Sequence, residues 1–387
     1  MIIRESTSDD LDDIWRMRVA AFGGPRQPGK GWPWDPATYR GFVAEQDGRP
    51  CGFLRVRRMG QYFGGASVPM GGVATVAVDP YARGLGVASR LLDTALADMR
   101  EQGQPLSALF TGVPQLYRRR GWERSGTVDG IRIASVDLRD VPASPLRLAP
   151  VTKSTVDSLL DCYRAVASRV NGMLDRAGPD QSLDRLLDSD IATVALDEDD
   201  EVCGYLAAER GTNELLNVSE LVALDGTVTA ALLRSLGSWT GRVREIHLRA
   251  ADQEGMSMII PVELEHNLEA KPWYLRVVDL PAAVAARGWP SARLLAEGTS
   301  VEFEIVDEHA PWHAGAHRLV VEDGTVRHEP FTGSPDLRLH ARALAPWFAG
   351  AASAATLRHA GLLDGTPDPV LDALTAAPGR PRMLDMF

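Results

Sequence analysis

The sequence predicts three units of mixed α/β structure: two tandem copies of one α/β fold and a smaller α+β domain after them. The chain has 387 residues, enough for two or three domains of roughly 150 residues each. One order of strands and helices runs twice, and a Cys-Gly-aromatic-Leu signature recurs 152 residues later, at Cys51 and Cys203. The remaining residues follow another pattern. We therefore expect domains at 1–145, 146–280 and 281–387.

The first unit shows the element order most clearly. Period-2 stretches predict strands, and apolar residues at i, i+3 and i+4 predict helices. A loop rich in Gly, Pro and Trp, at 23–36, separates the first helix from the first pair of strands. The expected strands are 1–4, 42–45, 51–56, 72–78, 107–111 and 130–133, and the expected helices are 11–18, 87–99 and a turn at 116–118.

The second unit repeats this order more faintly, and the third does not. In the second unit we expect strands at 146–148, 193–196, 202–206 and 218–223, and helices at 155–170 and 228–239. In the third unit, Pro281 suits the first turn of a short helix, and Asp323-Gly324 suits a hairpin turn. The expected elements there are helices at 281–287, 343–348 and 353–359 and strands at 301–305, 318–321 and 325–327.

The composition is that of a soluble globular protein. Hydrophobic residues make up 45% of the chain and charged residues 24%, which is enough apolar material for several cores. The three cysteines are too few and too far apart for a disulfide framework. We see neither a signal peptide nor an apolar run of about 18 residues, so we expect a cytoplasmic protein without a membrane span.

The net charge is unevenly distributed along the chain. Residues 1–145 have a formal charge of +3, whereas the remainder has −14. A mildly basic first unit suits a polyphosphate ligand, and an acidic remainder repels nucleic acid. We therefore expect no nucleic-acid partner.

The strongest local motif follows the buried strand of the first unit. A Gly-rich loop that contains Arg83 leads from this strand into a helix. Backbone N–H groups at a helix start have no internal partner and carry partial positive charge, so they can hold a pyrophosphate, and glycine lets the ligand approach the backbone. The alternative is a strand-to-helix turn that uses glycine only for its dihedral angles. The combination of Arg83, Gly86 and Ala88 favours phosphate binding.

This motif, Arg83-x-x-Gly86-x-Ala88, resembles the acetyl-CoA motif of the GNAT N-acetyltransferases. The resemblance implies acetyl-CoA as cosubstrate. It places the pyrophosphate on the backbone of the loop and the pantetheine arm along the preceding strand. The implied contacts are Arg83, Gly84, Gly86, Val87 and Ala88 for the pyrophosphate, and Val76 and Val78 for the pantetheine.

A second segment, residues 116–126, resembles the Tyr-x-x-x-Gly-aromatic segment of the same family. The resemblance makes Tyr117 the general acid that protonates the leaving thiolate of coenzyme A. A phenol with a pKa of ~10 is a reasonable match for a thiolate of ~8.5, and it stays protonated at neutral pH. The alternative is a structural tyrosine packed under a helix.

The three-part architecture resembles the enhanced intracellular survival (Eis) acetyltransferases. That resemblance implies a sterol-carrier-like fold for 281–387, a homohexamer, and a general base supplied by the chain's own C-terminal carboxylate, at Phe387. A carboxylate pKa of ~3.5 lies about 7 units below that of an alkylammonium, ~10.4, and burial would narrow this gap from both sides. The alternative is a frayed terminus.

The second copy lacks an equivalent of Arg83. Its corresponding turn reads Asp225-Gly226-Thr227, and a carboxylate there would repel a pyrophosphate. We therefore expect that this degenerate copy binds no acetyl-CoA and serves as a scaffold.

Candidate substrate-binding residues are aromatic or acidic, because a cationic acceptor needs cation–π faces and carboxylates. Trp32, Trp34 and Asp35 in the 23–36 loop, and Asp385 near the C-terminus, fit this requirement, although each could equally be structural. His309, His313 and His317 have a spacing that could hold a metal on a helix, but Pro311 and Gly315 would interrupt such a helix. We expect no metal site.

These observations predict an acetyl-CoA-dependent N-acetyltransferase that acts on a primary amine. The acceptor could be a cationic small molecule, aminoglycoside-like or a polyamine, or a lysine side chain. One alternative is a non-catalytic protein that binds a lipid in the sterol-carrier-like domain. Another is a tandem acyltransferase that uses a longer acyl-CoA.

Overall fold

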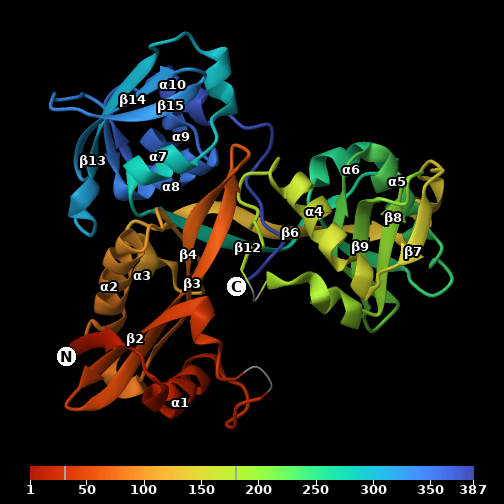
Figure 1. Cartoon of the computed structure of the whole chain (residues 1–387), viewed down its shortest axis with the longest axis horizontal. Helices are drawn as coiled ribbons and strands as arrows, with labels where there is room; N and C mark the ends of the chain where they lie inside the picture. The colour runs from red at the N-terminus through yellow and green to blue at the C-terminus, as the bar shows by residue number, and fades with distance from the viewer. Residues whose placement is uncertain (30–31, 179–180) are drawn as a thin grey trace.

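The computed structural model describes residues 1–29, 32–178 and 181–387, and it forms three lobes (Figure 1). We call them the first, second and third domains. In the described residues, one sheet of twelve strands runs through the first two domains, and the third domain has a sheet of five strands. No helix within the described ranges has both the length and the apolar character to cross a membrane.

In the first domain, two helices cover opposite faces of the sheet. Helix α1 packs Ile14 and Met17 against one face, and α2 packs a stripe of apolar residues against the other. The elements are β1 (Ile2–Glu5), α1 (Leu11–Phe22), β2 (Tyr39–Gln46), β3 (Arg49–Phe63), β4 (Ala66–Val78), α2 (Val87–Glu101), β5 (Leu106–Phe110), α3 (Pro114–Arg118) and β6 (Glu123–Ala134).

The second domain repeats this arrangement. Helix α4 packs on one face of its strands and α5 on the other. Its elements are β7 (Arg147–Pro150), α4 (Val156–Ala167), β8 (Ile191–Leu196), β9 (Val202–Arg210), β10 (Leu215–Ala223), α5 (Gly226–Gly237), β11 (Glu245–Ala250), α6 (Gln253–Ile259) and β12 (Glu265–Val277).

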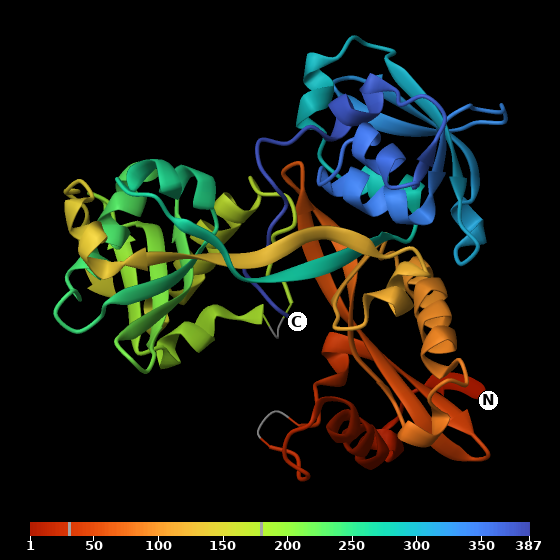
Figure 2. The same ribbon diagram turned by 180° about the vertical axis from the view of Figure 1, so that it is seen from behind.

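The two copies exchange strands. Strand β12, which ends the second unit, lies between β5 and β6, and Leu275 is paired with Ala108. Strand β6 pairs in turn with β11 of the second unit, where Ile133 lies opposite Ile246. Figure 2 shows these two long strands running from one lobe to the other. The domain boundaries at 145 and 280 stay predictions. The sheet is nevertheless continuous across the boundary at 145, because β6 pairs with β11.

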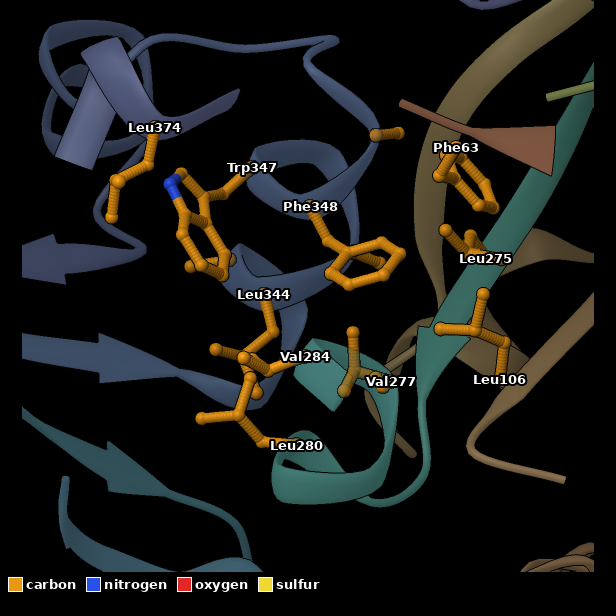
Figure 3. Close-up of a cluster of buried hydrophobic side chains, with 14 of the residues drawn as sticks. Phe63, Leu106, Leu275, Val277, Leu280, Val284, Leu344, Trp347, Phe348 and Leu374 are labelled. Atoms are coloured by element: carbon orange, nitrogen blue, oxygen red, sulfur yellow. The ribbon is translucent and has the colours of Figure 1, made fainter. Parts of the chain in front are cut away.

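The third domain is packed on the first through a large apolar cluster. The ring of Phe348 in the third domain contacts that of Phe63, at the end of β3, with centroids 5.2 Å apart, and Trp347 and Leu275 of β12 belong to the same cluster (Figure 3). Its elements are α7 (Leu280–Ala286), β13 (Ser300–Val306), β14 (Gly315–Glu322), β15 (Thr325–Pro330), β16 (Arg338–His340), α8 (Ala341–Ala349), α9 (Ala354–His359), β17 (Leu363–Asp364) and α10 (Pro369–Thr375).

Three histidines of the third domain, His313, His317 and His328, take part in a polar network that is largely buried. Nε2 of His313 lies 2.9 Å from Oδ2 of Asp307, which also accepts a hydrogen bond of 2.6 Å from Arg276 of β12. Nδ1 of His317 lies 2.8 Å from Nε2 of His328. His313 lies in a short 3₁₀ turn and His317 lies in β14, so the two do not share one helix face. No cluster of three or more potential metal ligands occurs within the described residues.

We expect this network to make the protein less stable below pH ~6.5. Burial lowers the pKa of His313, and also those of His317 and His328. The unfolded chain therefore binds protons that the folded chain excludes, and stability falls as the pH drops through the unfolded pKa toward the folded values. The melting temperature should decrease between pH 7.5 and 5.5. The decrease should be smaller in a double His317→Gln, His328→Gln variant and unchanged in the exposed control His359→Gln; a flat profile in the unaltered protein would contradict the expectation.

Candidate active site

The loop between β4 and α2 presents unused backbone donors. Gly84 and Gly86 have φ angles of +82° and +79°, a left-handed conformation that favours glycine. Within the described part of the chain, the backbone N–H groups of Gly84, Gly86, Val87 and Ala88 have no hydrogen-bond acceptor. A Cβ added to either glycine would meet nothing within 4 Å, so this face of the loop is open. The loop therefore fits an anion such as a pyrophosphate.

Arg83 adds a positive charge at the edge of this loop. Its side chain is exposed, and Nε donates a long hydrogen bond of 3.4 Å to the carbonyl of Val78, the last residue of β4. The guanidinium thus stays near the strand end, where it would reinforce the attraction for phosphate.

Strands β4 and β5 separate just before this loop. They pair in parallel only from Met70 to Gly72, opposite residues 106–108. Beyond that point β4 carries an irregularity: its pairing with β3 shifts register between Ala74 and Ala77, and Thr75 has a φ of +54°. A strand edge without a neighbour exposes backbone donors and acceptors. The stretch that contains Val76 and Val78 therefore offers backbone groups to an extended ligand arm.

Tyr117 lies in the short helix α3 and belongs to the apolar cluster against which Val76 and Val78 of β4 pack. It is 6% exposed, and its ring makes an edge contact with Trp122 at 6.2 Å between centroids. Burial raises the pKa of Tyr117 to about 12, although a side-chain hydrogen bond with Thr111, just after β5, opposes that rise. The phenol is therefore a protonated donor at neutral pH.

The chain ends at the same gap. We call residues 376–387 the C-terminal strap; it leaves the third domain and runs between the other two (Figure 1). The amide of Met383 donates to the carbonyl of Thr127 at 3.1 Å, which ties the strap to β6. The ring of Phe387 contacts that of Phe110, at the end of β5, with centroids 5.5 Å apart. A Cβ on Gly72 would lie 3.0 Å from this ring, so glycine leaves room for it.

A cavity of about 360 Å³ opens beside the tail. Its lining includes Phe110 and Thr111 from the first domain, Lys271 from β12, and Phe387 from the strap. The structure thus brings the terminal residue to the end of β5 and to Thr111, which forms a hydrogen bond with Tyr117.

An ion-pair network fixes the strap to the second domain. Asp385 accepts hydrogen bonds from Arg176 at 3.0 and 3.2 Å, and Arg176 also donates to Glu220 at 2.8 Å. Arg176 and Glu220 have side chains that are 2% exposed. Burial would raise the pKa of Glu220, but Arg176 and Arg185 outweigh it and hold this pKa below its ordinary value. The carboxylate of Asp385 therefore faces a cation of the chain itself, rather than an open substrate site.

Replacing Arg176 with methionine should destabilise the protein by about 3–5 kcal/mol, because it leaves Glu220 without its buried cationic partner. Denaturant unfolding measures this change in the free energy of unfolding. The matched control is Arg185→Met: Arg185 also pairs with Glu220, at 2.8 Å, but its side chain is 49% exposed. The Arg185→Met control should lower the free energy of unfolding by about 1 kcal/mol or less. Equal losses in the two variants would contradict the view that the buried Arg176–Glu220 pair fixes the strap.

The predicted aromatic residues form one cluster next to α1. The ring of Trp32 lies 4.9 Å from that of Trp15 and 4.8 Å from that of Trp34. The guanidinium of Arg55 lies over Trp34, 3.8 Å from the ring centroid. The exposed Asp35 caps a 3₁₀ turn by accepting a hydrogen bond from the amide of Ala37. Trp32 and Trp34 thus share a surface, while Asp35 has a local structural partner.

The corresponding loop of the second domain is closed by its own side chain. Asp225 accepts hydrogen bonds from the amides of Thr227 at 2.8 Å and Val228 at 3.0 Å, at the start of α5. These are counterparts of donors that stay open in the first domain. This geometry supports the prediction that the second copy binds no pyrophosphate.

Comparisons with known proteins identify the first and third domains. Residues 2–125 match the acetyltransferase (GNAT) domain family, and residues 280–384 match the sterol carrier protein domain family. The first domain is a GNAT acetyltransferase domain, and the protein is an acetyltransferase. It is 28% identical over 326 residues to an uncharacterized N-acetyltransferase of Streptomyces coelicolor, covering 77% of this chain and 75% of that protein. The GNAT fold implies acetyl-CoA as cosubstrate for this acetyltransferase.

Solved structures show the same architecture over the whole chain. A GCN5-related N-acetyltransferase from Kribbella flavida is 28% identical, with a TM-score of 0.84 over 100% of this chain and 98% of that one. Eis1 from Mycobacterium abscessus is 22% identical, with a TM-score of 0.77 and 100% of both chains covered, so it shares the fold of this acetyltransferase. The expected architecture, two tandem GNAT-like units and a sterol-carrier-like domain, is therefore confirmed, and so is the expectation of an enzyme.

Several residues at the candidate active site of this acetyltransferase were not predicted from the sequence. Phe110, Thr111, Arg176 and Glu220 are brought to the site by contacts between distant segments. Thr111 ends a predicted strand and precedes the Tyr117 segment, so its position was a usable signal. Arg176 and Glu220 carried no such signal, because an arginine and a glutamate 44 residues apart suggest a pair only once the fold is known.

Proposed function

We propose that this acetyltransferase transfers the acetyl group of acetyl-CoA to a primary amine, in the space between the β4–β5 gap and the C-terminal strap. The observation that carries the proposal is the juxtaposition of three features: the open amides of the 84–88 loop, the gap between the strands, and the tail ending at Phe110. The loop amides would bind the diphosphate, the gap between the strands would hold the pantetheine arm, and the tail would activate the amine.

The proposed reaction uses groups of the chain at both ends. The amine nitrogen forms a bond to the acetyl carbon, and the bond between that carbon and sulfur breaks. The carboxylate of Phe387 accepts the proton of the amine, directly or through water. Tyr117 donates a proton to the leaving thiolate. The nearby Phe110 and the ring of Phe387 supply apolar surface, which would raise the pKa of the carboxyl group and lower that of the amine.

Among the acceptors left open by the sequence, the contacts favour a lysine side chain over a polycation. Arg18 lies over Trp15 at 4.7 Å and Arg55 over Trp34 at 3.8 Å, so cations of the chain already cover two of the aromatic faces. Asp35, the carboxylate beside these rings, caps a turn. An aminoglycoside-like molecule or a polyamine would bring several positive charges next to these arginines, at a Coulombic cost.

A thiol-release assay with acetyl-CoA across a panel of amines tests this proposal. We expect the highest kcat/KM with a lysine-containing peptide, compared with spermidine and an aminoglycoside, and no release with the same peptide carrying acetylated lysine. A preference for spermidine would overturn the acceptor class, and no release with any amine would overturn the function. Faster release from hexanoyl-CoA than from acetyl-CoA would instead favour the longer-chain acyltransferase.

The packing of the third domain gives no support to the lipid-binding alternative. Phe303 and Trp347 are fully buried and their rings lie 6.2 Å apart between centroids, so side chains fill this part of the interior. A homohexamer rests on the family resemblance alone, and sedimentation analysis would measure the mass of the assembly. A cytoplasmic location stays a prediction from the sequence.

A further inference from the structure

A cavity of about 430 Å³ lies between the second domain and the C-terminal strap. It is separate from the proposed active site: its walls are the end of α4, the start of α5, residues 251–259 and residues 377–382 of the strap. Its apolar lining includes Val166, Val170, Leu224, Met256 and Ile259. A space of this size and composition is typical of a small-molecule site.

One buried cation on the cavity wall has unused hydrogen-bonding capacity. Arg382 is 8% exposed, and its Nη2 donates to Oε1 of Glu254 at 3.0 Å. Its Nη1 is buried and has no hydrogen-bond partner among the described residues. The backbone amide of Arg382 is bonded to the carbonyl of Asn171, which fixes the position of this residue in the strap. A buried donor without an acceptor is costly, so an acceptor from a ligand would be favourable.

The remaining charges around the cavity are largely compensated. Asp225 is bonded to two amides at the start of α5, and Asp252 accepts from the amide of Gly255 at 2.8 Å. Glu254 is the partner of Arg382. Two further arginines, Arg169 and Arg380, line the rim. The cavity thus carries three arginines against three carboxylates, each carboxylate already accepts a hydrogen bond, and the buried Nη1 of Arg382 is a donor that a ligand's carboxylate could satisfy.

We propose that this cavity binds a small carboxylic acid with an apolar body. The carboxylate accepts hydrogen bonds from Nη1 of Arg382, and the apolar body lies against Val170, Leu224 and Ile259. Acetyl-CoA does not fit this description, because Asp225 holds the α5 amides that a pyrophosphate would need. The proposal does not depend on the acetyl transfer proposed above, since none of the residues placed in that reaction line this cavity.

Calorimetric titration of the full-length protein with octanoate and with octanamide tests the proposal. The two probes have the same chain and differ in charge. We expect octanoate to bind at one site per chain, at least ~10-fold more tightly than octanamide, because a charge-assisted hydrogen bond is stronger than a neutral one. Equal affinities would overturn the proposed recognition of a carboxylate.

Two variants locate the site, and a third is the control. Arg382→Gln should reduce octanoate affinity to that of octanamide. Gly226→Phe should abolish binding of both probes, since a Cβ at Gly226 points toward Ile259 at 3.5 Å without a clash or a positive φ. The exposed Arg358→Gln, in the third domain, should bind octanoate normally. Normal octanoate binding by Gly226→Phe, or displacement of octanoate by acetyl-CoA from this cavity, would overturn the assignment.

Discussion

Replacing Tyr117 with phenylalanine should lower kcat by ~10²–10⁴-fold, the usual contribution of a general acid. The substitution removes only the hydroxyl group and leaves the ring against Trp122, so the fold should be kept. The KM for acetyl-CoA should change little, because the predicted coenzyme contacts lie in the 83–88 loop and along β4. The thiol-release assay at saturating substrate measures kcat directly.

The pKa of Tyr117 makes this assignment testable by pH as well. Burial raises that pKa to about 12, so the phenol stays protonated throughout the range in which the protein can be assayed. Any loss of activity on the alkaline side should therefore not arise from Tyr117. A Thr111→Val variant removes the hydrogen bond that opposes this rise. The phenol is kept but becomes a weaker acid, so kcat should fall.

The matched control is Tyr81→Phe, which removes a hydroxyl from a tyrosine that is 66% exposed. This variant should retain the kcat of the unaltered enzyme. Turnover by Tyr117→Phe at the same level as this control would remove Tyr117 from the mechanism.

The parts of the site that could be predicted from the sequence are those encoded in short segments. The 83–88 loop follows a buried strand and precedes a helix, and its two glycines adopt the left-handed conformation that their positions require. Asp225 is likewise a local signal, because an aspartate before a helix start caps its amides. In both loops, the relevant geometry depends on neighbours within a few residues.

The parts that could not be predicted depend on pairing between distant segments. Strand β12 was not expected as a strand, and nothing in its own sequence says that it lies between β5 and β6. The anchoring of Asp385 needs Arg176, more than two hundred residues earlier in the chain. Cation–π faces could be proposed for Trp34, but that Arg55 occupies one of them follows from the packing of β3 against the loop.

Removing the charge of the C-terminal carboxylate should also lower kcat by ~10²–10⁴-fold if this group is the general base. Semisynthesis can replace the terminal carboxylate of Phe387 with a carboxamide, which keeps the ring against Phe110 and the rest of the strap unchanged. An amide cannot accept the proton of the amine. Acetyl-CoA affinity should be retained, and the acidic limb of the pH–rate profile, which reports protonation of the base, should disappear.

The control for this experiment is Phe387→Leu, which retains the carboxylate and a smaller apolar side chain. Its kcat should fall far less than that of the carboxamide, because the reacting group is present although its anchor at Gly72 is weaker. If both proteins lost activity equally, the ring and its packing would matter and the charge would not. Full activity of the carboxamide would require another base, and the tail would then be only a wall of the acceptor site.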